Sequence, residues 1–427
     1  MLLKIKNTGK ISFAQIEISG ITVIAGVNNT GKSTVGKVLF CLFNSFYKIE
    51  QQIARERVKQ IADIIENDLY NIGIGFFDHE LNDFASSVCG RKAHYLGKKE
   101  CLAEDVRSFY FHAEAQYDTQ FNGTHFSDIS ERIMEVLTIT DEEISVAVFK
   151  KRLQAEFDVQ INNIYKTKLD SEIALKVNGR EIKIYVQGNE HIEIKDSFSL
   201  NSEVIYIDDP LAFDNLATSP TQFDWSHRGH LLTKLFVKSG TSPVKDAINE
   251  IIAAKKLEAV FAMLNNVCKG DVISKNSSHR FTIAYLNDDS KTALSIQNVS
   301  TGIKSFAILK TLLQNGSLHE NGILVLDEPE IHLHPEWQLV FAELVVLLQK
   351  EFNIRILLNT HSPYFLDAID VYSHKYDIAD RCKYYLAEDD DDTTAAVVTD
   401  VSSDIERIYD KLSRPLQELE NERYSDD

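Results

Sequence analysis

One short segment near the start of the chain constrains the fold more than any other. It reads Gly26-Val27-Asn28-Asn29-Thr30-Gly31-Lys32-Ser33 and matches the pattern GxxxxGK[ST]. A nearly continuous apolar run, Ile21 to Ala25, precedes it, and helical periodicity follows from Ser33 to about Tyr47. A buried strand, a glycine-rich turn and a helix in this order are typical of a phosphate-binding loop. The segment therefore predicts an α/β domain with a site for a phosphorylated ligand.

The residue types of this loop suit a nucleoside triphosphate. Glycines let successive backbone N–H groups turn toward phosphate oxygens, and the helix adds its positive N-terminus. Lys32 is expected to neutralise the β- and γ-phosphates, and Ser33 to offer its hydroxyl to Mg²⁺. The predicted ATP-binding residues of this segment are Gly26, Asn28, Asn29, Thr30, Gly31, Lys32, Ser33 and Thr34.

An acidic pair ends a second apolar strand. Residues 322–326 lead directly into Asp327 and Glu328. Ligands of open α/β sheets bind at the carboxyl ends of strands, so this pair is expected beside the phosphate loop. Asp327 is predicted to hold Mg²⁺ through water, and Glu328 to orient or deprotonate the attacking water. Together the two motifs predict an enzyme that hydrolyses ATP.

A third motif, Ser300-Thr301-Gly302, precedes a predicted helix. Such a turn binds anions at a helix N-terminus, but it is also a common simple cap, with Ser300 or Thr301 as the capping residue. The local sequence favours the cap, whereas the order and spacing of the motifs favour an anion site.

A fourth motif places a histidine at a strand end. His361 follows the apolar strand Ile354 to Leu358 within Asn359-Thr360-His361-Ser362-Pro363. A lone histidine is usually structural, but this position favours contact with a γ-phosphate.

The order of elements predicts three regions. Residues 1–45 form the N-terminal lobe of the core, 46–200 a mostly helical insertion with a small sheet, and 201–427 the C-terminal lobe. The insertion contains a predicted capping box at Thr140 and a hairpin with a type I′ turn at Asn178-Gly179. Helix and strand alternate from residue 301 to 369, which predicts parallel strands with right-handed crossovers.

Composition limits the classes of partner. The net charge of −19 disfavours nucleic acid and anionic membrane, so any DNA contact needs a local basic patch or a partner protein. The five cysteines form no CxxC pair, and the sequence contains no apolar run of about 18 residues, the length that a membrane span needs. A cytoplasmic protein is therefore expected. The acidic run Glu388 to Asp392 is interpreted as a solvated turn rather than a metal site.

These motifs, in this order, resemble ABC-type ATPases of the AAA family. Asp327 to Pro335 and Asn359 to Pro363 are similar to the OLD-like ATPases, relatives of SMC and RecF heads that are common in bacterial defence operons. The resemblance covers about 1–44 and 203–427, and it implies an ABC-type head with an N-terminal antiparallel β subdomain.

The resemblance also implies a homodimer that sandwiches ATP. Ser300, Thr301 and Gly302 of one protomer would cap the γ-phosphate bound by the other, with His361 as the switch histidine and 330–335 as the loop crossing the interface. An alternative is that His332 and His334 bind a metal. Gln222 is the candidate for the glutamine that usually completes the Mg²⁺ shell in that family.

Departures from the family pattern narrow the function. The signature Val299-Ser300-Thr301-Gly302-Ile303 differs from the transporter form Leu-Ser-Gly-Gly-Gln, and a zinc hook or long heptad arm is not evident. The residues after His361 are too few for the Toprim nuclease domain of OLD nucleases. The expected function is the ATPase subunit of an anti-phage defence complex that controls a separately encoded effector such as a nuclease, with 46–200 as the docking surface. Alternatives are an SMC/RecF-like DNA-repair ATPase and a non-hydrolysing, nucleotide-gated scaffold.

Overall fold

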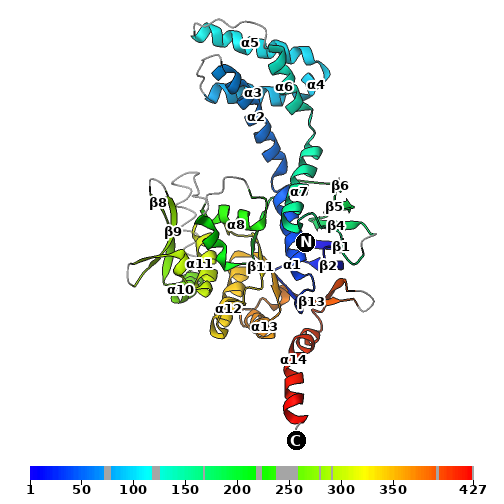
Figure 1. Cartoon of the computed structure of the whole chain (residues 1–427), viewed down its shortest axis with the longest axis vertical. Coiled ribbons are helices and arrows are strands. Elements are labelled where there is room, and N and C mark those ends of the chain that lie inside the picture. Colours follow the sequence, from blue (N-terminus) through cyan, green and yellow to red (C-terminus); the bar gives the residue numbers. More distant parts are fainter. Residues whose placement is uncertain are drawn as a thin grey trace. The chain divides into compact units, whose positions relative to one another are not determined.

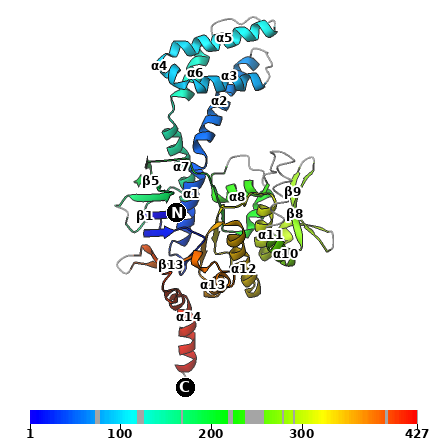
Figure 2. The ribbon, with the colours of Figure 1, turned by 180° about the vertical axis from the view of Figure 1, so that it is seen from behind.

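The computed structural model describes residues 1–71, 78–117, 126–166, 169–217, 224–236, 258–277, 280–289, 292–390 and 394–425. The chain divides into two compact units. The first comprises Met1–Ser45, Phe149–Phe198 and Ser202–Asp427, and the second comprises Phe46–Val148 with Ser199–Asn201. Figures 1 and 2 show the elements of both units from opposite sides.

A mixed sheet of eleven strands forms the first unit, in the order β6-β5-β4-β1-β2-β14-β13-β3-β12-β11-β7. Its strands are β1 (Leu2–Thr8), β2 (Ile11–Glu17), β3 (Ile21–Ala25), β4 (Ser171–Val177), β5 (Arg180–Gln187), β6 (His191–Lys195), β7 (Val204–Ile207), β11 (Ile323–Asp327), β12 (Arg355–Thr360), β13 (Cys382–Asp389) and β14 (Ala396–Asp400).

The strands from β13 to β7 are parallel and form one end of the sheet. β3 pairs in parallel with both β12 and β13, and β11 pairs in parallel with β12 and β7. Every residue of β3 and β11 is buried, as expected for strands covered on both faces. The predicted parallel α/β core is therefore confirmed, and β13 adds a strand to it that the sequence reading did not include.

Helices cover both faces of these parallel strands. Alternate β11 residues, Leu324 and Leu326, belong to a core with side chains of α11 (Thr301–Gln314), α12 (Pro335–Phe352) and α13 (Pro363–Lys375). Val325 points to the other face, where its Cγ1 would lie 2.9 Å from a Cβ added at Gly36 of α1 (Lys32–Phe46). The same strand thus fixes α1 on one side and the later helices on the other.

The antiparallel part of the sheet moves one predicted boundary. β4 pairs with β1, so Phe149–Phe198 cluster with the first unit, whereas the expected insertion ran from 46 to 200. The physical reason is that backbone hydrogen bonds join β1 to a hairpin that is far away in the sequence. In that hairpin Asn178 and Gly179 have φ of 50° and 81°, which confirms the predicted type I′ turn.

The remaining described elements of the first unit lie mostly between β7 and α11 in the sequence. They are η1 (Pro210–Ala217), α8 (His227–Phe236), α10 (Glu258–Val267), β8 (Gly270–Ser277), β9 (Arg280–Asn287), β10 (Ala293–Ser295) and η2 (Ile296–Asn298), followed later by η3 (Ala379–Arg381) and α14 (Glu406–Ser425). β9 pairs antiparallel with both β10 and β8, which gives a separate sheet of three strands. The apolar periodicity of the sequence predicts a helix over 244–267, of which 258–267 form α10 and 244–257 lie outside the described residues.

The second unit is helical. It contains α2 (Ile49–Asn71), α3 (Asp78–Gly90), α4 (Lys92–Gly97), α5 (Lys99–Tyr117), α6 (Phe126–Thr138) and the first residues of α7 (Asp141–Phe157). These helices enclose a core of their own that includes Ile65, Tyr95 and Ile133. The predicted capping box is confirmed, since Thr140 N donates to Glu143 Oε2 at 2.8 Å and Glu143 N donates to Thr140 Oγ1 at 3.1 Å.

Candidate nucleotide-binding site

The phosphate loop joins β3 to α1 and turns on residues with positive φ. Asn29 and Gly31 have φ of 63° and 81°, a conformation that lets N–H groups converge. The Lys32 side chain is buried and donates from Nζ to the carbonyl oxygens of Gly26 and Val27, both at 2.9 Å. The Lys32 side chain therefore folds back onto the first two residues of the loop.

Gly26 is required for a tertiary reason. A Cβ added there would lie 2.3 Å from the carbonyl oxygen of Ala387, a distance that real Cβ atoms do not show. Ala387 belongs to β13, so the loop passes directly against the neighbouring parallel strand.

The acidic pair lies at the end of β11, beside the loop. Asp327 is nearly buried, and it accepts hydrogen bonds from the Tyr206 hydroxyl to Oδ2 at 2.7 Å and from Asn359 Nδ2 to Oδ1 at 2.9 Å. Glu328 has a φ of 51°, and its backbone N donates to Asn359 O at 2.9 Å. Strand β12 therefore fixes both the side chain of Asp327 and the backbone of Glu328.

Three of the predicted residues meet at one carboxylate oxygen. Glu328 Oε1 lies 3.5 Å from Lys32 Nζ and 3.3 Å from His361 Nδ1. Glu328 and His361 directly follow β11 and β12, and Lys32 begins α1 after the loop that leaves β3, so the three side chains meet beside three neighbouring strands. The structure therefore brings together the phosphate loop, the acidic pair and the strand-end histidine.

Glu330 was quoted in the motif but not predicted as a site residue. Its side chain is buried, and Oε1 accepts from Thr360 Oγ1 at 2.5 Å and from His361 N at 3.2 Å. Burial raises the pKa of this carboxyl above its ordinary value, although the hydrogen bonds oppose that change. Glu330 thus fixes the backbone on which His361 stands.

The signature segment lies at the start of α11. Ser300 occupies the N-cap position with φ −61° and ψ 145°, but its exposed side chain makes no capping hydrogen bond. A Cβ added at Gly302 would lie 3.1 Å from the Trp337 ring and 3.2 Å from His332 O. The contacts of this segment are thus with residues of the 330–337 region, and the Ser300 hydroxyl is not used to cap the helix.

One of the two histidines of that region begins a helix. His334 is the N-cap of α12, and its Nδ1 accepts from Glu336 N at 3.4 Å. Within the described residues, no group of three or more His, Cys, Asp or Glu side chains is arranged to hold a metal ion. The helix cap therefore accounts for His334.

Two other expectations concern peripheral residues. Gln222 lies outside the described residues. In the described part of the acidic turn, Asp389 Oδ1 pairs with Lys10 Nζ at 3.0 Å and Glu388 Oε1 with Arg407 Nη2 at 3.4 Å, so both carboxylates have basic neighbours.

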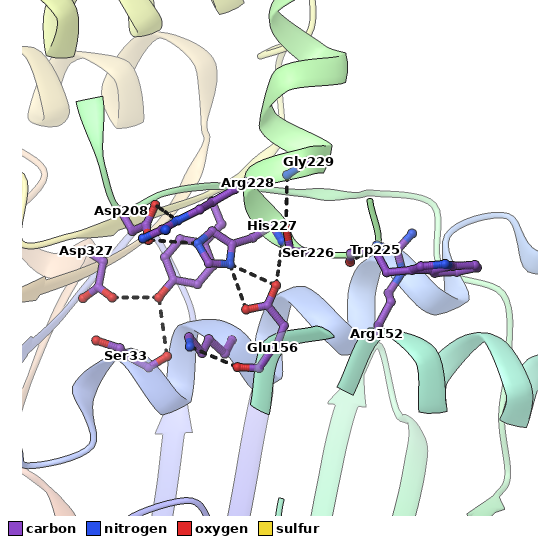
Figure 3. Close-up of polar contacts among 12 residues, drawn as sticks. Ser33, Arg152, Glu156, Asp208, Trp225, Ser226, His227, Arg228, Gly229 and Asp327 are labelled. Atoms are coloured by element: carbon purple, nitrogen blue, oxygen red, sulfur yellow. Dashed lines mark hydrogen bonds and ion pairs between the residues drawn. The ribbon is translucent and has the colours of Figure 1, made fainter. Parts of the chain in front are cut away.

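A polar cluster behind Asp327 was missed from the sequence. The Tyr206 and His227 rings are stacked, with centroids 4.3 Å apart and planes at 24°. His227 Nδ1 lies 2.8 Å from Glu156 Oε2, and Nε2 lies 3.0 Å from Asp208 Oδ2 (Figure 3). The tyrosine was hidden within an apolar strand, and only Asp208, directly after that strand, carried a signal that could have been noticed.

The neighbouring carboxylates shift the pKa values of His227 and Tyr206 in this cluster. Burial alone would lower the pKa of His227, but the hydrogen bonds and charges of Asp208 and Glu156 outweigh it and raise the pKa to about 9. Burial and the nearby carboxylate of Asp327 raise the pKa of Tyr206 well above its ordinary value, so its hydroxyl remains a donor.

A strand, a phosphate loop, a helix and an acidic strand end, all at one sheet edge, define a nucleotide-binding protein of the P-loop class. The family model described as "AAA ATPase domain" matches residues 1–366, and the chain belongs to that family. The expected resemblance to ATPases of this kind is thereby confirmed. No helix among the described residues has both the length and the apolar character that crossing a membrane demands.

Two curated relatives match a limited segment. The chain is 36% identical over 98 residues to "Retron Vc95 probable ATPase" of Vibrio cholerae serotype O1 biovar El Tor, which covers 23% of this chain and 18% of that protein. It is 34% identical over 94 residues to "Retron Ec83 probable ATPase" of Escherichia coli, covering 19% of this chain and 17% of that protein. The chain thus matches less than a fifth of the length of either relative.

Solved structures similar to this chain include SMC head domains. One is an SMC head bound to the C-winged helix domain of ScpA, with 12% identity, coverage of 95% and 98% of the two chains and a TM-score of 0.48. Another is the SMC head domain from Thermotoga maritima, with 11% identity, coverage of 94% and 98% and a TM-score of 0.37. At these TM-scores the likeness supports no conclusion about this chain.

Proposed function

We propose that this protein binds Mg·ATP at the phosphate loop and hydrolyses it to ADP and phosphate. One observation carries the proposal: Glu328 Oε1 lies within 3.5 Å of both Lys32 Nζ and His361 Nδ1. A carboxylate so placed is suited to accept a proton from an attacking water, while the two cationic or polar neighbours face developing phosphate charge. Glu328 and His361 are thus the proposed catalytic residues.

The loop residues supply the nucleotide contacts of the proposal. Backbone N–H groups and side chains of 26 and 28–34 surround the phosphates, with Lys32 turning from the carbonyls of Gly26 and Val27 toward them. The nearness of Lys32 to Glu328 supports this, because the same ammonium can serve either group. Belonging to an ATPase family supports ATP as the nucleotide.

The proposed Mg²⁺ ligands are Ser33 and, through water, Asp327. They fit the ion because Mg²⁺ prefers oxygen donors, and because the Tyr206 hydroxyl, 2.7 Å from Asp327 Oδ2 and 3.5 Å from Ser33 O, lies next to both. When bound, the ion neutralises charge on the β- and γ-phosphates. Asp327 retains lone pairs beyond the two hydrogen bonds that it accepts, so it can also accept from water.

The proposed assembly is a homodimer in which ATP lies between two protomers. Ser300, Thr301 and Gly302 of each protomer would contact the γ-phosphate held by the other. The exposed Ser300 hydroxyl, which does not cap its own helix, supports this arrangement. Because Gly302 packs tightly on Trp337 and His332, the signature would move together with the 330–335 loop.

The proposed biological role is the ATPase subunit of a bacterial anti-phage defence complex that controls a separately encoded effector, such as a nuclease. The names of the two retron relatives and the OLD-like motifs support it. The helical unit, which has its own core, is the proposed docking surface for that effector.

Purified protein, with Glu328→Gln beside it, tests the enzymatic proposal. Loss of the base should slow ATP turnover by roughly 10²–10⁴-fold and leave ATP binding intact. Equal turnover by the two proteins would favour the non-hydrolysing scaffold instead.

The dimer is tested by the mass in solution of the Glu328→Gln protein with and without Mg·ATP. ATP should drive or tighten a dimer, and adding Ser300→Arg should abolish that response, since the bulky Arg side chain would keep the signature segment away from the γ-phosphate. A mass that ignores both nucleotide and Ser300→Arg would leave the signature as a helix start only.

A further inference from the structure

A buried tyrosine stands behind the proposed magnesium ligand. Tyr206 lies on β7, the edge strand next to β11, and its side chain is fully buried. Its hydroxyl donates to Asp327 Oδ2 at 2.7 Å and lies 3.5 Å from the backbone oxygen of Ser33. One phenol therefore touches both the acidic strand end and the first turn of α1.

His227, the first residue of α8, holds the tyrosine from behind. Its ring stacks on Tyr206, and both of its nitrogens are engaged, Nδ1 by Glu156 and Nε2 by Asp208 (Figure 3). The backbone N of His227 also donates to Glu156 Oε1 at 2.6 Å. The imidazole cannot turn without breaking at least one of these contacts, so its position follows that of Glu156.

Glu156 belongs to the last turn of α7, a helix that contributes residues to both compact units. Asp141–Val148 lie in the second unit and Phe149–Phe157 in the first. One turn before Glu156, the Arg152 guanidinium lies 5.4 Å from the Phe40 ring and 5.6 Å from the Trp225 ring, and it donates to Trp225 O at 3.4 Å. Two side chains on one face of α7 therefore hold the segment that leads into α8.

We propose that Tyr206 is a positioning residue for Asp327, and that His227 links it to Glu156 so that α7 influences how Asp327 serves magnesium. The inference rests on the proposed function, because it assumes that Asp327 acts on Mg·ATP. Hydrogen bonds to both oxygens, from Tyr206 and Asn359, fix the rotation of the carboxylate. Loss of such an outer partner typically costs 10–100-fold in metal affinity or activity.

Tyr206→Phe tests the positioning role, since it removes one oxygen and keeps the ring stacked on His227. In the full chain, the Mg²⁺ concentration for half-maximal ATP turnover should rise by roughly tenfold or more, while ATP binding in EDTA stays unchanged. A merely structural tyrosine would lower stability without moving the Mg²⁺ requirement. A wild-type Mg²⁺ requirement in Tyr206→Phe would overturn the assignment.

Tyr384→Phe is the matched control. Tyr384 is also nearly buried in the same sheet, and its hydroxyl donates to Asp370 at 3.1 Å, so the same kind of tyrosine–aspartate hydrogen bond is lost outside the site. Its Mg²⁺ requirement should equal that of the wild type. If both variants raise the requirement equally, the effect is general and the positioning role falls.

The link to α7 is tested by a double-mutant cycle. Glu156→Gln keeps the shape of the side chain but weakens its grip on His227, so it should raise the Mg²⁺ requirement in the same direction as Tyr206→Phe. Because both changes act through one chain of contacts, the double variant should show less than the product of the two single effects. Strictly multiplicative effects would overturn the link.

Two further proteins keep this cycle interpretable. Glu142→Gln changes an exposed carboxylate on the same helix and should leave the Mg²⁺ requirement unchanged. If Glu156→Gln does not fold, Glu156→Asp, which keeps the charge and shortens the side chain, replaces it in the cycle. Absence of Mg²⁺-dependent turnover in the wild type would overturn the proposed function as well, whereas normal wild-type turnover with an unaffected Tyr206→Phe overturns this inference alone.

Discussion

Nδ1 of His361 lies 3.3 Å from Oε1 of Glu328, although the two residues end different strands. The contact depends on the parallel pairing of β11 with β12, in which Asp327 is opposite Asn359. Glu330 holds the backbone N of His361 and so fixes the distance. The histidine therefore contacts Glu328, the proposed general base, and lies where the proposed function requires a γ-phosphate contact.

Replacing His361 should affect the chemical step more than binding. We expect His361→Ala to lower kcat by roughly 10²-fold, because it removes a hydrogen-bonding group that faces developing charge. Affinity for ATP should change little, since Lys32 and the loop amides remain. Single-turnover hydrolysis and equilibrium binding of a fluorescent ATP analogue separate the two effects. A large loss of binding with an unchanged chemical step would place His361 in nucleotide binding instead.

Lys32 should be needed for affinity. Lys32→Ala removes the charged donor that now bonds Gly26 O and Val27 O, and each hydrogen bond to a charged group is worth about 1.5–3 kcal/mol. Affinity for Mg·ATP should therefore fall by roughly 10–100-fold, as measured by titration calorimetry. The control is Lys310→Ala in α11, a buried lysine whose Nζ donates to Gly270 O at 2.8 Å rather than to the loop. Unchanged affinity in Lys32→Ala would remove the loop from the nucleotide site.

Gly26 should tolerate no side chain. In Gly26→Ala the new methyl would lie 2.3 Å from Ala387 O, so the loop or β13 must shift at a cost of about 1–3 kcal/mol. Both thermal stability and ATP affinity should drop. Gly97→Ala is the contrasting variant, because a Cβ there meets nothing within 4 Å and alanine favours a helix. If Gly26→Ala kept the stability and ATP affinity of Gly97→Ala, the loop would not lie directly against β13 at this position.

Stability should decrease at high pH because of His227. Its pKa is raised to about 9 in the folded chain, above the ordinary value of 6.5, so the folded state binds its proton more tightly. The contribution is complete below about pH 6.5 and is lost as the pH rises through about 9. Its size is on the order of a few kcal/mol. His230 acts oppositely, since burial lowers its pKa, and its effect appears as the pH falls toward and below its ordinary value.

Denaturant unfolding of wild type and His227→Gln at pH 6.5 and pH 9 checks this sign. The wild type should lose stability between the two pH values, and the variant should lose markedly less. An equal loss in both proteins would mean that other groups titrate in this window.

The local sequence determined the motifs, the tight turn and the main strands and helices of this protein, because these features depend on residues that are close together in the sequence. A glycine-rich turn between an apolar strand and a helix, an Asp-Glu pair after a second apolar run, and the Asn178-Gly179 turn each express backbone preferences of neighbouring residues. The parallel core, the capping box at Thr140 and the family followed from them. Burial on both faces explains why β3 and β11 were easy to recognise.

Only the tertiary structure decided which distant residues meet. The hairpin of β4 and β5 pairs with β1 and not with the helical unit. Residues 149–198 therefore cluster with the first unit, although 46–200 was expected as one insertion, because sheet hydrogen bonds do not depend on sequence distance. Likewise, Tyr206 reads as one more apolar strand residue until β7 is seen beside β11 and α8 behind it. Local patterns report the backbone preference and burial of each segment, whereas hydrogen bonds such as that from Tyr206 to Asp327 exist only after separate segments pack together.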